Sequence, residues 1–114
     1  MDLKYEFYYK FKEVTTEKYG DIENVIIEIR FFHCLNAIGD DENNPEIHKL
    51  MVLHFPYVEG EPYIDGTNIT KELLIKAIEN KLGAEEIKKM EESLIYQYHE
   101  KLQIVTKKKI TLDL

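Results

Sequence analysis

The segment that most constrains the fold of this chain is residues 25–35, which read VIIEIRFFHCL. Nine of its eleven residues are apolar, aromatic, Cys or His. Because alternate side chains of a strand point to opposite faces, one face of this segment is almost wholly apolar and the other is about half apolar. The pattern predicts the central strand of a sheet that is covered by helices on one side and partly covered on the other.

Two other segments show strand-like alternation. Residues 3–14 place most of their aromatic side chains on one face and all of their lysines on the other, which is typical of a half-buried strand. Residues 48–58 predict a third strand, in which Pro56 marks an end, an edge or a bulge. Residues 15–23 contain Gly20 and Asp21 and are predicted to be a turn or short loop, so the first two strands should form an antiparallel hairpin.

The second half of the chain is predicted to be mainly helical. Residues 70–82 form an amphipathic helix, with Thr70 as its cap and Gly83 as its terminator. Its apolar arc of roughly 200° is wide enough to touch both the sheet and a second helix, or a partner chain. Residues 84–105 predict that second helix, and residues 107–114 alternate as a short final strand does.

Together these elements predict a single α+β domain over residues 1–114. An antiparallel sheet is made of a three-strand meander and the C-terminal strand, and an αα-hairpin packs on one face of the sheet. The order of the strands is left open, because the final strand can pair with either the first or the third.

Charge and hydropathy narrow the range of partners. The formal net charge is −7, and an acidic surface repels the phosphates on which nucleic-acid affinity mainly depends. We therefore expect no direct nucleic-acid binding and no attachment to anionic membranes.

No apolar run approaches the roughly 18 residues of a membrane span, and the N-terminal residues do not resemble a secretory signal. A cytoplasmic location is the default expectation.

No motif identifies a reaction. The five glycines are isolated, so there is no phosphate-binding loop, and there is no nucleophile elbow. The single cysteine, Cys34, lies inside an apolar strand and is interpreted as a small buried hydrophobe. The histidines lack the spacing of a closed metal site. We therefore predict no catalytic residues, no metal and no cofactor, and we favour a binding role over an enzymatic one.

Two sets of residues are candidates for binding. A protein-binding surface is predicted from tyrosines, which are enriched at interfaces, and from clustered carboxylates: Tyr8, Tyr96, Asp40, Asp41, Glu42, Glu85 and Glu86. A ligand pocket between the sheet and the helices is the alternative, and it would be lined by Arg30, His33 and His54. For Glu28 and Arg30, which share a strand face, a structural ion pair is the favoured interpretation.

Three functions are compatible with these features. The leading hypothesis is a small acidic cytoplasmic interaction module for a basic protein partner, such as an inhibitor or adaptor encoded by a phage or mobile element. In one form of this hypothesis, carboxylates in residues 40–46 and 85–92 mimic nucleic-acid phosphates. The alternatives are a small-ligand binding protein or enzyme that uses the pocket, and a structural homo-oligomer that uses the wide apolar arc of the first helix.

Overall fold

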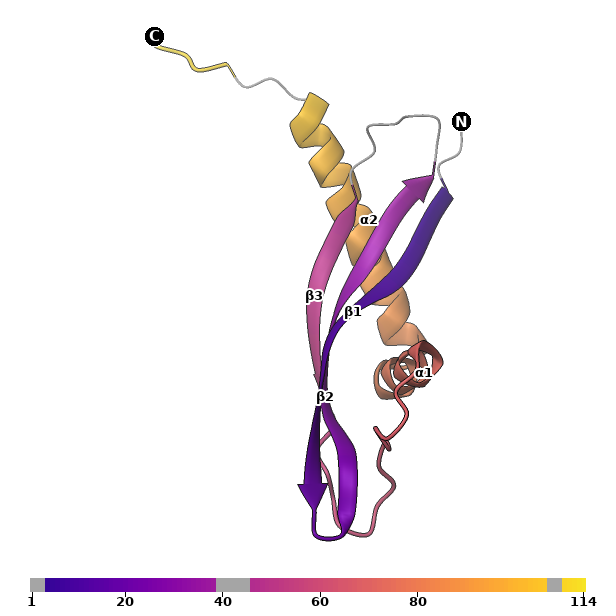
Figure 1. Cartoon of the computed structure of the whole chain (residues 1–114). Helices are drawn as coiled ribbons and strands as arrows, with labels where there is room; N and C mark the ends of the chain where they lie inside the picture. The colour runs from indigo at the N-terminus through magenta and orange to yellow at the C-terminus, as the bar shows by residue number, and fades with distance from the viewer. Residues whose placement is uncertain (1–3, 39–45, 107–109) are drawn as a thin grey trace.

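The computed structural model describes residues 4–38, 46–106 and 110–114, with the side chains of all of these except 102–106. Three strands precede two helices: β1 (Lys4–Tyr19), β2 (Ile22–Ile38), β3 (Ile47–His54), α1 (Lys71–Leu82) and α2 (Ala84–Thr106). The strands form one antiparallel sheet in the order β1-β2-β3, and both helices lie on the same side of it (Figure 1). The predicted α+β fold and its central strand are confirmed.

The β1–β2 hairpin is longer than the sequence pattern predicts. Most of residues 15–23, expected to be a turn, continue the two strands, and Tyr19 lies opposite Ile22. The turn itself consists of Gly20 and Asp21, with Gly20 at φ 61°. A two-residue hairpin turn commonly needs such a positive φ, which glycine adopts without strain. Three bulges interrupt the pairing and shift the alternation of faces. A strand predicted from strict alternation therefore ends before the observed strand does.

The remaining strand predictions are corrected at their ends. β3 stops at His54, before Pro56, because proline has no amide hydrogen to donate to a neighbouring strand. The predicted C-terminal strand is not confirmed. Residues 110–114 have no regular secondary structure and are exposed, and residues 107–109 lie outside the described part of the chain. The alternating apolar side chains of that segment meet no sheet edge.

The core lies between the helices and the sheet face formed by the odd-numbered residues 29–37 of β2. Beneath α1, the buried cluster consists of Ile26, Ile29, Phe31, Leu74, Ala77 and Ile78. Beneath α2, it consists of Leu35, Ala37, Ile47, Leu94 and Tyr98. The αα-hairpin therefore packs on one face of the sheet, as predicted, and burial of these apolar side chains is the main force that holds the two layers together.

The ends of α1 are fixed by the residues that the sequence indicates. The hydroxyl of Thr70 accepts a hydrogen bond from the backbone amide of Leu73 at 3.1 Å. Gly83 has φ 82° and donates its backbone N–H to the carbonyl of Glu79 at 2.8 Å. Because one residue separates the helices, α2 starts immediately and turns away to run along the sheet (Figure 1).

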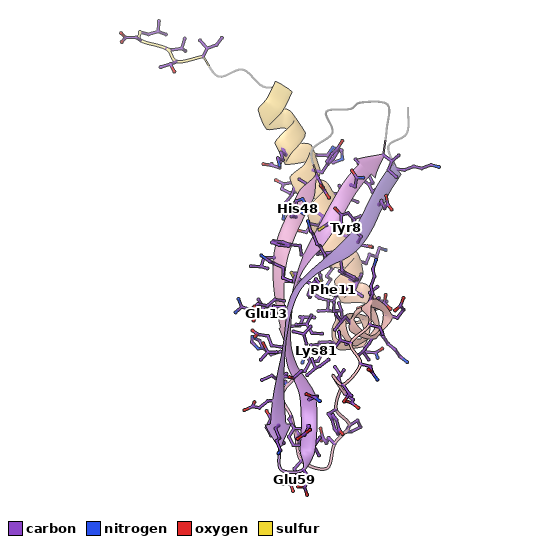
Figure 2. The ribbon with its side chains drawn as sticks, viewed as in Figure 1. Tyr8, Phe11, Glu13, His48, Glu59 and Lys81 are labelled. Atoms are coloured by element: carbon purple, nitrogen blue, oxygen red, sulfur yellow. The ribbon has the colours of Figure 1, made fainter. Side chains whose placement is uncertain are left out.

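The other face of the sheet is covered by neither helix. In Figure 2, Phe11 lies on the side of β1 toward the helices, whereas Glu13 points to the opposite side. Beyond α1, the β1–β2 hairpin continues as an arm, accompanied by the chain that leads from β3 to α1. The amide of Ile26 donates to the carbonyl of Ile64 at 3.0 Å, which ties that segment to the arm. We call the uncovered side of the sheet the open face.

Candidate functional site

A cavity of about 380 Å³ lies between the sheet and the helical hairpin. Its volume falls in the range of small-ligand sites, roughly 300 to 1,000 Å³. Three of its residues are one helical turn apart on α1, two are one turn apart on α2, and the others come from β1 and β2. The lining is Phe7, Tyr8, Tyr9, His33, Lys71, Ile75, Glu79, Ile87 and Glu91. We call this space the helix-side cavity.

His33 forms part of the sheet side of this cavity. Its side chain is 1% exposed, and its ring centroid lies 5.2 Å from that of Tyr9 and 6.2 Å from that of Phe7. Burial, assisted by the positive charge of Lys49, lowers the pKa of His33, so the ring is neutral at pH 7. Its Nδ1 atom has no hydrogen-bond partner among the described residues. Most buried polar groups have such partners, so this nitrogen is an exception that sits at a cavity.

The carboxylates of the cavity act on Tyr9. Burial is the largest cause of the raised pKa of Tyr9, and the negative charges of Glu79 and then Glu91 add to it. The phenol is therefore protonated at neutral pH. Lys71 is the one cationic side chain in the cavity lining, so two carboxylates outnumber one ammonium group. The cavity therefore has aromatic side chains on its sheet side and a net negative charge on its helix side.

The structure divides the three residues of the predicted ligand pocket between the two faces of the sheet. His33 lines the helix-side cavity, whereas Arg30 and His54 lie on the open face. There Glu28 brings the last two together: its Oε1 is 3.6 Å from Arg30 Nε and 4.0 Å from His54 Nδ1. Thr15 donates its hydroxyl to Glu28 Oε2 at 3.3 Å. The predicted ion pair of Glu28 and Arg30 is confirmed as part of this cluster.

A second open-face cluster surrounds Cys34. Its Sγ atom is 3.3 Å from His48 Nδ1, and His48 Nε2 is 3.4 Å from a carboxylate oxygen of Glu46. Cys34 is buried, as predicted, and burial raises its pKa against the weaker opposing effect of Lys10. The sulfur is thus a protonated thiol without access for a substrate. Among the described side chains, no group of three His, Cys, Asp or Glu residues is arranged to hold a metal ion.

The predicted partner-binding residues are spread over the molecule. Tyr96 is 66% exposed, and its hydroxyl donates to Glu100 at 3.0 Å. Tyr8, expected to be exposed, is half-buried and contributes to the lining of the cavity. Glu85 and Glu86 are exposed in the first turn of α2. The predicted acidic loop residues Asp40, Asp41 and Glu42 lie outside the described residues.

Sequence reasoning missed most of the helix-side cavity. It placed Tyr9 on the buried face of β1 but did not single out Glu79, Glu91 or Lys71. Helical spacing was the available signal, because residues 71, 75 and 79 share one side of α1 and residues 87 and 91 share one side of α2. Which sides of the two helices line the same cavity depends on how the helices dock on the sheet, and the spacing does not contain that information.

Comparison of the chain with protein-family models, with curated proteins and with solved structures gives no match. Within the described ranges, no helix has both the length and the apolar character that crossing a bilayer requires. Function is therefore inferred from the geometry and charge of the candidate sites.

Proposed function

We propose that the protein is a binding module that receives a positively charged segment of a protein partner at the helix-side cavity. The observation that carries this proposal is the convergence of Glu79 from α1 and Glu91 from α2 beside the aromatic side chains of β1 and β2. Carboxylates together with aromatic rings favour cationic groups over neutral or anionic ones. The net charge of −7 supports the same partner class.

The proposed biological form is an inhibitor or adaptor that acts on a basic protein in the cytoplasm, of the kind that phages and mobile elements encode. Long-range attraction by an acidic surface speeds the encounter with such a partner, and short-range contacts at the cavity select it. The charge-mimicry variant differs in one respect, because it relies on summed negative charge and needs no cavity.

A panel of fluorescent peptides rich in Arg or Lys, with Asp-rich and neutral peptides of equal length, tests this function on the full chain. The Glu79→Gln/Glu91→Gln variant removes the cavity carboxylates. The matched control is Glu59→Gln/Glu61→Gln, which removes the same charge near the tip of the arm, where Figure 2 shows Glu59. We expect only the basic peptides to bind. The cavity variant should bind them with an affinity at least about tenfold lower, because charge-assisted contacts are lost.

Two outcomes contradict the proposal. Equal binding of basic and neutral peptides shows that the partner is not cationic. Equal weakening in the two double variants shows that affinity follows net charge alone, which is the result expected of charge mimicry.

The small-ligand alternative has one observation in its favour, the helix-side cavity itself. Its volume suits a drug-sized molecule, and His33 offers a buried, unpartnered nitrogen. In that case a free small molecule, and not a peptide, would saturate the cavity.

A further inference from the structure

Building on the function proposed above, we propose that the helix-side cavity takes one arginine side chain of the partner. The guanidinium group lies between the carboxylates of Glu79 and Glu91 and against the rings of Phe7 and Tyr9, with His33 beneath it. Protonation of His33 then opposes binding.

The aromatic side of the cavity suits a flat cation. Tyr9 and His33 form a close pair with centroids 5.2 Å apart and planes tilted by 35°, and Phe7 flanks the histidine. A guanidinium ion is planar, delocalised and weakly hydrated, so it stacks on rings at a low cost in desolvation. An ammonium ion is a compact and strongly hydrated charge, and it gains less from such a surface.

The polar groups of the cavity also suit a guanidinium ion. It carries five N–H donors in a rigid fork, and the cavity offers matching acceptors on two carboxylates that come from different helices. Lys71 leaves the lining one negative charge in excess, which one arginine neutralises.

His33 makes this site sensitive to pH. Lys49 on β3 lies opposite His33 in the sheet, and the charged or titratable groups that line the cavity with it are Tyr9 on β1, Lys71 and Glu79 on α1, and Glu91 on α2. Its neutral state places no positive charge beneath the arginine, and its Nδ1 atom is unpartnered in the described structure. A proton on this buried ring would put two cations close together, and like charges at short range repel.

The test uses three short peptides that differ at one position, with Arg, Lys or neutral citrulline in a Gly/Ser background. Each is titrated into the full-length protein and followed by NMR of the backbone amides and the histidine rings. We expect the Arg peptide to perturb residues that line the cavity, to bind about fivefold or more tightly than the Lys peptide, and to outcompete citrulline, which has no charge.

The coupling between peptide binding and protonation of His33 provides a second test, which uses the unmodified protein. If protonation of His33 opposes arginine binding, saturation with the Arg peptide must lower the pKa of His33 by the corresponding amount. Affinity for the peptide should also fall as the pH drops below 6.5 and through the lowered pKa of His33. In His33→Asn, which carries no titratable group at position 33, this fall in affinity should be lost. Because the asparagine could disturb the buried cluster, the pKa measurement in the unmodified protein decides the matter.

The results separate the inference from the proposed function. One outcome would refute the inference but retain the binding module: Arg-rich peptides bind, whereas the single-Arg peptide changes neither the signals of the cavity residues nor the pKa of His33. Equal affinity for Arg and Lys would also refute it. A single-Arg peptide that seats in the cavity, while longer basic peptides bind no more tightly, would uphold the arginine site and refute docking of an extended basic segment.

Discussion

Adjacent residues of β2 have opposite surroundings, and this decides their chemistry. His33 points to the helix side and is packed among aromatic rings, whereas Cys34 points to the open face beside His48. Burial keeps both groups neutral: it lowers the pKa of the imidazole and raises that of the thiol. Each therefore predicts a measurable response to solvent conditions.

We predict that acidification destabilises the protein through His33. Its pKa in the folded state lies below the ordinary value of 6.5, so the unfolded chain binds more protons just below that pH. The contribution of the neutral ring to stability is complete above pH 6.5 and declines as the pH falls toward the lowered folded value. Urea unfolding at several pH values measures this decline, which should be smaller in His33→Asn. An equal decline in both proteins would show that other groups cause it.

We predict that Cys34 reacts slowly with alkylating reagents in the folded protein. The sulfur is buried and its raised pKa disfavours the thiolate, which is the reactive form. Mass spectrometry after iodoacetamide treatment should show a rate about a hundredfold or more below that in concentrated urea, because modification must await opening of the sheet. Similar rates in both conditions would mean that His48 holds an accessible thiolate.

At the level of elements, α1 has two roles, since one side covers Ile29 and Phe31 and another lines the helix-side cavity. The wide apolar arc that the sequence gives this helix is thereby explained without a partner chain. Its start is fixed by a single side chain, so the helix cap is the simplest place to test how strongly α1 supports the fold.

We predict that Thr70→Ala lowers the free energy of unfolding by about 1 kcal/mol, the usual cost of losing a helix cap. The hydroxyl of Thr70 satisfies the amide of Leu73, and alanine leaves that donor to solvent. Thr70→Ser keeps the hydroxyl and is the matched control. Urea denaturation of the three proteins measures the effect, and equal losses in both variants would assign it to the methyl group.

The whole molecule is elongated, because the hairpin arm and the end of α2 extend beyond the two-layer body (Figure 1). The radius of gyration is 19.2 Å and the principal extents are 70 × 37 × 23 Å. A compact chain of this length has a radius of gyration of about 13 Å. An elongated monomer and a compact dimer behave alike in gel filtration, which bears directly on the homo-oligomer alternative.

We predict that the protein elutes early from a sizing column while light scattering gives the mass of one chain, 13.6 kDa. Elongation alone accounts for early elution, since the column separates by hydrodynamic size. Small-angle scattering should give a radius of gyration close to 19.2 Å. A scattering mass of two chains would instead support the homo-oligomer.

The sequence by itself determined the elements and their layers. The alternation in residues 25–35 marked the central strand, and Thr70 and Gly83 marked the limits of α1, because these signals act between neighbours in the chain. The same local signals failed at residues 15–23, where bulges break the period of two, and at residues 110–114, which have no regular secondary structure despite their alternating pattern.

Only the tertiary structure decided the candidate site. Glu79 and Glu91 belong to different helices, and their place with His33 around one cavity follows from how the αα-hairpin docks on the sheet. The register of β3 likewise set His48 beside Cys34 and His54 beside Glu28. Docking and register depend on many contacts between distant residues, each weak by itself, so no short stretch of sequence encodes them.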